Sequence, residues 1–200
     1  MKTAFCFDLD GTITKDEILP LLSKKIDLFE EISALTDATI KGIIPFQKSF
    51  LLRCRLLQEI PISTVQEIVS GVRVYSQVVD FIAANRENCF VITGNLDAWV
   101  APFASILGCR CFCSEALVVD DRLVKVERVL NKGDAVKIIR EDYDKIVAIG
   151  DGMGDVHMFT HSDVCIAYGG THMPVQTLQQ MSNFLTFDEN SLCSLLNTLL

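Results

Sequence analysis

The chain has 200 residues, 50% of them hydrophobic and 22% charged, and carries a formal net charge of −8. This composition can build a full core, and the length suits one domain or one domain with a sizeable insertion. The acidic balance argues against general nucleic-acid binding. No apolar run reaches the roughly 18 residues of a membrane span. Early acidic residues also interrupt the apolar stretch that a signal peptide needs.

The chain opens on a short apolar run, residues 3–9, that predicts a buried strand. Two aspartates, Asp8 and Asp10, lie at the end of this run. Period-2 alternation places both aspartates on the same side of that strand. Neighbouring carboxylates repel each other and must be hydrated, paired or bound to a cation. The pattern therefore indicates a positively charged partner at the end of the first strand.

Residues 15–72 contain no convincing strand and predict only helices. The helical candidates are 16–26, 27–40, 45–60 and 63–71. Ser63 with Gln66 resembles a capping box, and Pro45 fits a first helical position. We therefore predict a small all-helical cap domain at 15–72, inserted into a core domain formed by 1–14 and 73–200.

Beyond the cap, apolar runs alternate with helical patterns. Strands are predicted at 89–93, 109–113, 145–150, 163–167 and 183–187, and helices at 75–88, 96–107, 132–141, 154–162 and 173–181. Two alternating runs about Asp120-Asp121 predict a β-hairpin. The leucine-rich stretch 190–200 predicts a closing helix that could equally serve a dimer contact, so the oligomeric state stays open. The fold class is α/β: a Rossmann-like, mostly parallel sheet with helices on both faces.

The eight cysteines include Cys109, Cys111 and Cys113, which would face the same way on a strand. A zinc site would be expected to show a paired CxxC or a nearby histidine, and neither is present. We interpret the cysteines as buried thiols of a reduced, cytoplasmic protein. The three histidines are scattered along the chain and receive no role.

A second acidic cluster, GDGMGD at 150–155, follows a predicted buried strand and contributes Asp151 and Asp155. Ligand sites in parallel α/β sheets form at the carboxyl ends of the strands, where Asp8 and Asp10 also lie. Four converging carboxylates need a cation, and hard oxygen ligands suit Mg²⁺.

Two further segments suit a phosphate group. Thr93, Gly94 and Asn95 offer a hydroxyl and backbone N–H groups near a helix start, which favours anion binding. Lys132 precedes a helix and could neutralise phosphoryl charge. An aspartate can act as the nucleophile, and a second carboxylate can protonate the leaving oxygen and then activate water.

These features resemble the four ordered motifs of the haloacid dehalogenase (HAD) superfamily of phosphatases. The motifs are DLDGT at 8–12, Thr93, Lys132 and GDGMGD at 150–155. The resemblance implies that Asp8 is the nucleophile and Asp10 the general acid/base. It also implies that Thr93 and Lys132 hold the phosphate, and that the helical insert is a type 1 cap.

The resemblance further implies a Mg²⁺ cofactor. Its ligands would be Asp8, the main-chain carbonyl of Asp10, and Asp151, with Asp155 supporting the metal shell.

Two cap residues bear on the substrate. On a helix, Arg53 lies in an apolar stripe while Arg55 points the opposite way. An arginine there needs an anionic partner, either in a structural ion pair or on a substrate carboxylate. Glu17 either forms a capping box with Thr14 or meets a substrate ammonium group. Within the superfamily, the chain resembles phosphoserine phosphatases, whose corresponding glutamate and arginine bind the amino and carboxylate groups of phosphoserine.

The chain departs from that pattern at three places: Gly11 replaces a common Ser, Asn95-Leu96 replaces Gly-Phe, and Gly154 replaces a common Asn. We predict a Mg²⁺-dependent phosphatase that acts through an aspartyl phosphate on phosphoserine or a similar small metabolite. Substrate would be bound by Glu17, Arg53, Gly94 and Asn95. The alternatives are a phosphatase for a sugar, amino-alcohol or cofactor phosphate, and a non-hydrolytic regulator that accepts a phosphoryl group.

Overall fold

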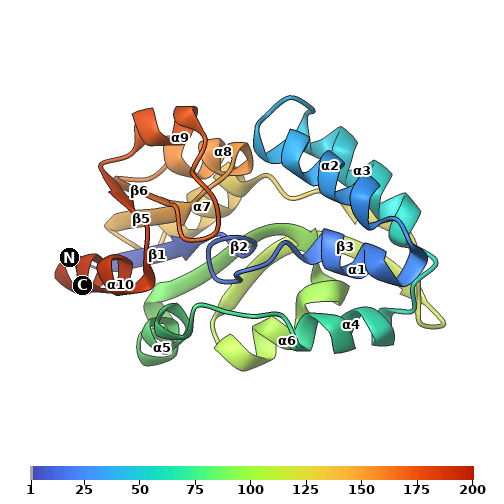
Figure 1. Cartoon of the computed structure of the whole chain (residues 1–200). Coiled ribbons are helices and arrows are strands. Elements are labelled where there is room, and N and C mark those ends of the chain that lie inside the picture. The colour runs from blue at the N-terminus through green and yellow to red at the C-terminus, as the bar shows by residue number, and fades with distance from the viewer. Residues whose placement is uncertain (1) are drawn as a thin grey trace.

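The computed structural model describes residues 2–200 and contains one seven-stranded sheet (Figure 1). The strands are β1 (Thr3–Phe7), β2 (Cys89–Leu96), β3 (Arg110–Val119), β4 (Arg122–Arg128), β5 (Lys145–Gly150), β6 (Val164–Tyr168) and β7 (Phe184–Thr186). Their order across the sheet is β4-β3-β2-β1-β5-β6-β7. Only the β3–β4 pair is antiparallel, so the predicted α/β fold with a mostly parallel sheet is confirmed.

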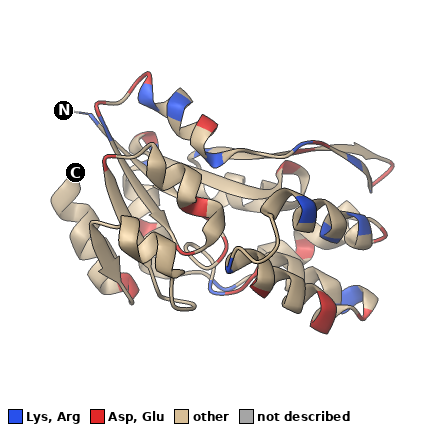
Figure 2. Cartoon of the chain, turned by 90° about the horizontal axis from the view of Figure 1, so that it is seen from above, with Lys and Arg blue, Asp and Glu red and all other residues tan. Residues whose placement is uncertain are grey.

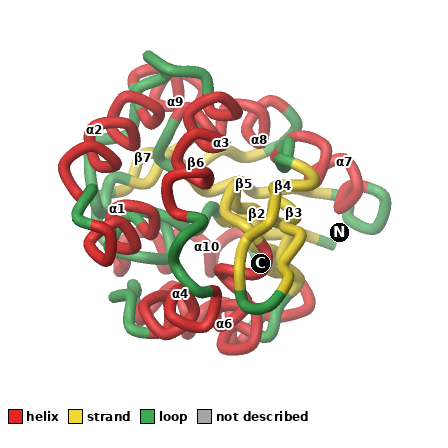
Figure 3. The backbone as a smooth tube through the Cα atoms, turned by 90° about the vertical axis from the view of Figure 1, so that its right-hand side faces the viewer, coloured by secondary structure: helices red, strands yellow, loops and turns green. Residues whose placement is uncertain are grey.

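Helices cover both faces of this sheet (Figure 3). The α-helices are α1 (Ile18–Ser23), α2 (Phe29–Ile40), α3 (Phe46–Leu57), α4 (Ile62–Ser70), α5 (Ser76–Ala84), α6 (Asp97–Leu107), α7 (Lys132–Arg140), α8 (Val156–Thr160), α9 (Gln176–Met181) and α10 (Glu189–Leu199). Short 3₁₀ turns are η1 (Lys24–Ile26), η2 (Arg86–Asn88) and η3 (Met153–Asp155). Within residues 2–200, no helix has both the length and the apolar character of a membrane span.

The alternation of β1 explains the two layers of helices. Phe5 and Phe7 lie on one face, where both rings pack edge-on against Phe81 of α5. Ala4 and Cys6 lie on the other face, in the cluster with residues of α7, α8 and α9. Because successive strand residues point to opposite faces, a fully apolar strand such as β1 must be covered on both sides.

The register of the central strands brings the polar strand ends together. Phe7 pairs with Val91 of β2 on one side and with Ile149 of β5 on the other. The next residue, Asp8, donates its backbone N–H to Ile149 at 2.9 Å. The residues that follow β1 and β5, and the carboxyl-terminal part of β2, therefore share one edge of the sheet.

Helices α1 to α4 form the helical insert after β1. The chain leaves and re-enters the sheet region at adjacent points, because Thr14 and Val74 form an antiparallel bridge. Lys15 also donates its N–H to the carbonyl of Arg73 at 2.8 Å, and the Arg73 guanidinium pairs with Asp16. The boundaries of a separate cap domain at 15–72 stay a prediction.

The predicted hairpin is present, but it is longer than expected. The run 109–113 and the first arm of the hairpin form a single strand, β3, which turns into β4 at Asp120 and Asp121. Both turn residues have positive φ, 47° and 63°, as a type I′ hairpin turn requires. Figure 2 shows the hairpin as a ribbon that extends beyond the sheet, with acidic residues at its turn.

The turn of this hairpin explains why one helix start was predicted incorrectly. Ser63 donates its backbone N–H and its hydroxyl to the Asp121 carboxylate, at 2.8 and 2.6 Å. Gln66 donates instead to the carbonyl of Ala98, at 2.8 Å. The predicted capping box is therefore wrong, because a side chain distant in sequence satisfies the first turn of α4. Pro45 likewise precedes α3 as its N-cap rather than occupying the first helical position.

Candidate active site

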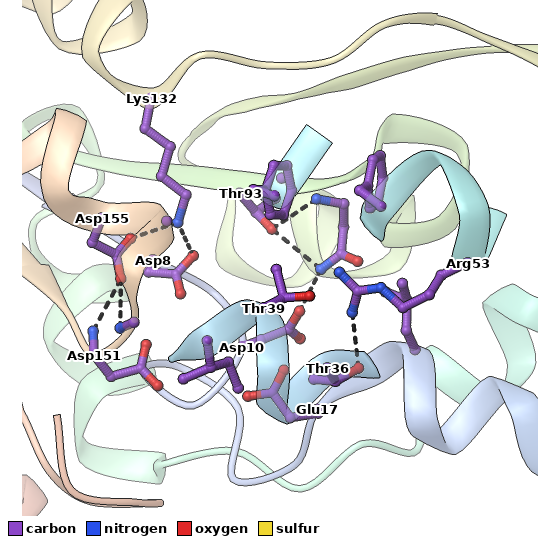
Figure 4. Close-up of a pocket in the computed structure, with 18 residues that line it drawn as sticks. Asp8, Asp10, Glu17, Thr36, Thr39, Arg53, Thr93, Lys132, Asp151 and Asp155 are labelled. Atoms are coloured by element: carbon purple, nitrogen blue, oxygen red, sulfur yellow. Dashed lines mark hydrogen bonds and ion pairs between the residues drawn. The ribbon is translucent and has the colours of Figure 1, made fainter. Parts of the chain in front are cut away.

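The polar edge of the sheet and the helical insert enclose a cavity of about 90 Å³ (Figure 4). All ten residues that the sequence predicted for the site line it: Asp8, Asp10, Glu17, Arg53, Thr93, Gly94, Asn95, Lys132, Asp151 and Asp155. They come from segments up to 147 positions apart in the chain. The individual roles assigned to them stay predictions, but the structure brings them together.

Lys132 lies between two buried carboxylates. It is the first residue of α7, whose N-cap Asn131 accepts a hydrogen bond from Gly133. The Lys132 Nζ contacts Asp155 Oδ1 at 2.6 Å and forms a short ion pair with Asp8 Oδ1 (Figure 4). Burial opposes the charge on Lys132, but the attraction of Asp155 and Asp8 outweighs it and raises the pKa of the ammonium group. Lys132 is therefore a fixed cation beside Asp8.

Asp155 also shapes the turn that follows β5. Its Oδ2 accepts the backbone N–H groups of Asp151 and Gly152, at 3.0 and 3.1 Å. Both carboxylate oxygens of Asp155 thus have protein partners, one in this turn and one in Lys132. The arrangement holds Asp151 in place and suits a supporting role for Asp155.

The carboxylates of the cavity are electrostatically unfavourable without a further cation. Burial, and then repulsion from Asp155, raises the pKa of Asp8 despite the opposing attraction of Lys132. Burial, and then repulsion from Asp10 and Asp151, raises the pKa of Glu17 well above its usual range. Burial also raises the pKa of Asp151. Lys132 and Arg53 are two cations against the five acidic side chains that line the cavity, so the site favours an added positive ion.

The donor set fits a divalent metal. Asp8, Asp151 and Asp155 each place one oxygen within 4.8 Å of the others. Oxygen donors of this kind are the ligands of Mg²⁺, which keeps water or substrate oxygens in the rest of its shell. The Asp10 carboxylate is not in this group, and the assignment of its main-chain carbonyl as a ligand stays a prediction.

The Asp10 side chain is held from two sides. Asn95 Nδ2 donates to Asp10 Oδ2 at 2.7 Å, and the backbone N–H of Ile18 donates to Oδ1 at 3.3 Å. Burial raises the pKa of Asp10 to about 6, even though these two hydrogen bonds lower it. A carboxyl group of that pKa can give and take a proton near neutral pH. Asn95, predicted as a substrate ligand, has Asp10 and Thr93 as its partners in this structure.

Gly94 permits a close approach between β2 and the insert. A Cβ atom at this position would lie only 2.2 Å from Cζ of Phe46, on α3. Phe46 in turn stacks on Phe50, with ring centroids 5.2 Å apart. The glycine therefore lets an aromatic pair of the insert close directly over the end of β2.

Arg53 is buried, with 4% of its surface exposed, and has only neutral partners. Its guanidinium donates to the Thr36 hydroxyl at 2.8 Å and to the carbonyl of Ser49 at 3.4 Å. The Ser49 hydroxyl accepts a hydrogen bond from the Thr39 hydroxyl, at 2.6 Å. Within residues 2–200, no carboxylate pairs with Arg53, so the alternative of a structural ion pair is not met. An unpaired buried guanidinium is costly unless a ligand supplies the anion.

Glu17 lines the same cavity and does not cap α1. It is the N-cap residue of α1 by position, but its side chain makes no capping bond. The Thr14 hydroxyl donates to the carbonyls of Leu9 and Asp16 instead. The capping-box alternative is therefore wrong, and the carboxylate is available to a ligand.

Three polar residues near this site escaped the sequence prediction. Thr36 and Thr39 lie on the buried side of α2, where two hydroxyls three positions apart were a detectable signal. His172, in the loop after β6, lies with Nε2 only 2.6 Å from Asp151 Oδ2. No local pattern marked it, because its partner is 21 residues earlier and on another strand end.

Comparisons with known proteins agree with this geometry. A model of haloacid dehalogenase-like hydrolases matches residues 5–160. The phosphoserine phosphatase of Methanocaldococcus jannaschii is 26% identical over 180 residues, covering 84% of this chain and 85% of that protein. That of Archaeoglobus fulgidus is 24% identical over 84% of this chain, but the match spans only 52% of its length.

Solved structures show the same fold. A substrate-bound phosphoserine phosphatase complex has a TM-score of 0.84 at 20% identity and covers 97% of this chain and 98% of its own. A phospho-aspartyl intermediate analogue of phosphoserine phosphatase has a TM-score of 0.83 at 22% identity, with coverages of 96% and 97%. The chain therefore belongs to the haloacid dehalogenase-like hydrolase family and is a phosphatase enzyme similar to phosphoserine phosphatases.

Proposed function

We propose that this phosphatase hydrolyses a small phosphorylated amino acid, with L-phosphoserine as the first candidate, through an aspartyl phosphate on Asp8 and with Mg²⁺ as cofactor. The observation that carries the substrate class is the buried Arg53, whose guanidinium has no carboxylate partner within residues 2–200. Glu17 lies in the same cavity, where a substrate ammonium group would offset the burial and repulsion that raise the pKa of Glu17 and would favour its ionised form. This pair suits the carboxylate and ammonium groups of an amino acid.

The proposed chemistry uses the two aspartates after β1 in turn. Asp8 attacks phosphorus while the bond to the substrate oxygen breaks, and Asp10 donates a proton to that leaving oxygen. Lys132 and Thr93 stabilise the negative charge on the transferring phosphoryl group. Water then attacks phosphorus, Asp10 takes a proton from it, and the bond between Asp8 and phosphorus breaks to release phosphate.

Asp8 and Asp151 would hold Mg²⁺ together with the main-chain carbonyl of Asp10, and Asp155 would orient that set. The bound ion would supply positive charge that offsets the repulsion between the carboxylates and the phosphate.

The substrate class is tested with three phosphomonoesters that differ in one group each. Phosphate release is measured with Mg²⁺ for L-phosphoserine, for phosphoethanolamine, which lacks the carboxylate, and for the phosphate ester of 3-hydroxypropionate, which lacks the amine. We expect L-phosphoserine to have the highest kcat/KM. Equal or faster turnover of phosphoethanolamine would move the assignment to amino-alcohol phosphates, one of the alternatives that the departures at Gly11, Asn95 and Gly154 leave open.

Arg53→Ala is expected to lower kcat/KM for L-phosphoserine by about 10- to 100-fold, because a charge-assisted hydrogen bond to the substrate is lost. Phosphoethanolamine should change far less, since it has no carboxylate to lose. Arg55→Ala, on the exposed side of the same helix, is the matched control and should resemble wild type. An equal loss for both substrates would show that Arg53 supports the fold of the insert rather than the substrate carboxylate.

Magnesium is expected to stabilise the protein more at pH 7 than at pH 5. Burial raises the pKa of the two carboxylate ligands Asp8 and Asp151, and it raises the pKa of Asp10 to about 6 against 3.8 for an unperturbed aspartate, so the native state retains these protons above the usual pKa of an aspartate. Metal-free stability therefore falls as pH rises through this window, and the ionised carboxylates that Mg²⁺ binds become available. Saturating Mg²⁺ should raise Tm by about 5–10 °C at pH 7. Equal gains at the two pH values would contradict this account of the carboxylates.

A further inference from the structure

We propose that Thr36 is a further specificity-determining residue, whose hydroxyl joins the Arg53 guanidinium as a direct ligand of the substrate carboxylate. Thr36 lies on α2 and is buried, with 4% of its surface exposed. Both side chains line the active-site cavity and contact each other there (Figure 4). This inference rests on the proposed function, because it concerns the carboxylate of a phosphorylated amino acid.

One face of α2 forms part of the cavity wall. Thr36, Thr39 and Ile40 line the cavity, and spacings of three and four positions place them on the same side of a helix. The two threonines differ in their bonds. The Thr39 hydroxyl lies 2.6 Å from both the carbonyl oxygen of Leu35 and the Ser49 hydroxyl, so its proton has acceptors within the protein.

The Thr36 hydroxyl keeps its proton available. A hydroxyl has one proton to donate and lone pairs that accept. Arg53 Nη1 donates to Thr36 Oγ1 at 2.8 Å, and a guanidinium cannot accept in return. A helical threonine can donate to the carbonyl four positions earlier, as Thr39 does, but within residues 2–200 no acceptor takes the Thr36 proton. That proton can therefore be donated to a ligand in the cavity.

The Arg53 guanidinium also has donors to spare. Its bonds to Thr36 and to the carbonyl of Ser49 use only part of its N–H groups. The remaining N–H groups and the Thr36 proton are all donors, and one of the two side chains carries a positive charge. An anion with two acceptor oxygens matches this set, whereas an ammonium group does not. The donors therefore select a carboxylate.

The surroundings of these donors are largely apolar. Phe46 and Phe50 line the same cavity, and Phe50 has 1% of its surface exposed. Glu17 lines it too, but across residues 2–200 its carboxylate forms no hydrogen bond with Thr36 or Arg53. In a site of low polarity a hydrogen bond to a charged group is stronger than in water, and an unmet donor is more costly. The loss of the Thr36 donor should therefore be measurable.

Thr36 and Arg53 would share the recognition of one carboxylate. Arg53 supplies the charge, and Thr36 supplies a neutral donor that the branched side chain and the bond from Arg53 hold in place. Phosphoethanolamine has no carboxylate to accept from either residue. Thr36 should therefore increase the preference for a phosphorylated amino acid over an amino-alcohol phosphate.

The test measures kcat/KM for L-phosphoserine and for phosphoethanolamine in Thr36→Val, which removes the hydroxyl and keeps the shape of the side chain. We expect kcat/KM for L-phosphoserine to fall by about tenfold or more, and that for phosphoethanolamine to change far less. Thr36→Ser retains a hydroxyl and should recover most of the loss. Thr39→Val is the matched control on the same face of α2, and any loss there should be equal for the two substrates because its hydroxyl bonds within the protein. Thermal unfolding checks that each variant is folded.

A double substitution separates a direct ligand from a residue that only holds Arg53 in place. A direct ligand still contributes when the arginine is absent. Adding Thr36→Val to Arg53→Ala should therefore lower kcat/KM for L-phosphoserine again, by about threefold or more. No further loss in the Arg53→Ala background would overturn the assignment of Thr36 as a ligand.

The Arg53→Ala variant, measured in the same assay, shows which proposal has failed. Suppose that its loss is confined to L-phosphoserine, while Thr36→Val loses both substrates equally or neither. The inference about Thr36 is then wrong and the proposed function stands. If Arg53→Ala loses both substrates equally, or wild type does not prefer L-phosphoserine, the proposed substrate class is wrong and the inference falls with it.

Discussion

Asp8→Asn is expected to reduce phosphate release by at least ~10⁴-fold while the protein stays folded, since removal of a nucleophile eliminates the chemical step. The substitution keeps the shape of the side chain and replaces an ionisable oxygen with an amide. It also removes a charge whose burial, together with repulsion from Asp155, raises the pKa of the carboxyl group. The metal-free variant should therefore be no less stable than wild type.

The measurement combines steady-state phosphate release with thermal unfolding, both with and without Mg²⁺. The gain in Tm on adding Mg²⁺ should be smaller in Asp8→Asn than in wild type, because one ligand oxygen is lost. Turnover within tenfold of wild type in a folded variant would exclude Asp8 as the nucleophile.

Lys132→Ala is expected to lower both activity and stability. Its Nζ pairs with Asp8 and Asp155, and the side chain is 10% exposed. Removal leaves two buried carboxylates without their cation, which costs about 3–5 kcal/mol in the free energy of unfolding. It also removes the positive charge that would stabilise the transferring phosphoryl group. We therefore expect kcat/KM to fall by about 10²–10³-fold.

Urea unfolding and steady-state kinetics measure the two effects separately. Lys137→Ala is the matched control, because Lys137 lies on the same helix, has 58% of its side chain exposed and, among residues 2–200, pairs only with Asp134. That variant should lie within about 0.5 kcal/mol of wild type in stability. If Lys132→Ala behaved like Lys137→Ala in both measurements, the buried ion pairs would have neither of the effects assigned to them.

The sheet and its acidic edge could be predicted from sequence because their signals are local. Short apolar runs such as 145–150 mark buried strands, and the residues directly after them must lie at the carboxyl edge. Asp8 and Asp151 therefore converge in the structure as the pattern indicates. The apolar stripe around Arg53 is also a local signal, because helical periodicity alone places that arginine on the buried face of α3.

Several contacts that sequence did not predict join residues distant in the chain. Asn95 pairs with Asp10 across 85 positions, and Ser63 pairs with Asp121 across 58. The sequence predicted a capping box for Ser63 and a substrate contact for Asn95. In the structure each side chain instead bonds to a residue that is distant in the chain. His172 had no local signal at all, because only the path of its loop brings it to Asp151.

The central claim is that Asp8 accepts the phosphoryl group of a small phosphorylated amino acid. The most direct test mixes wild-type protein with L-phosphoserine and Mg²⁺, quenches with acid during turnover, and locates the modified peptide by mass spectrometry. We expect one phosphoryl group on the peptide that contains Asp8, and none in Asp8→Asn. Phosphate release without any label on Asp8, or no reaction with L-phosphoserine at all, would contradict the account.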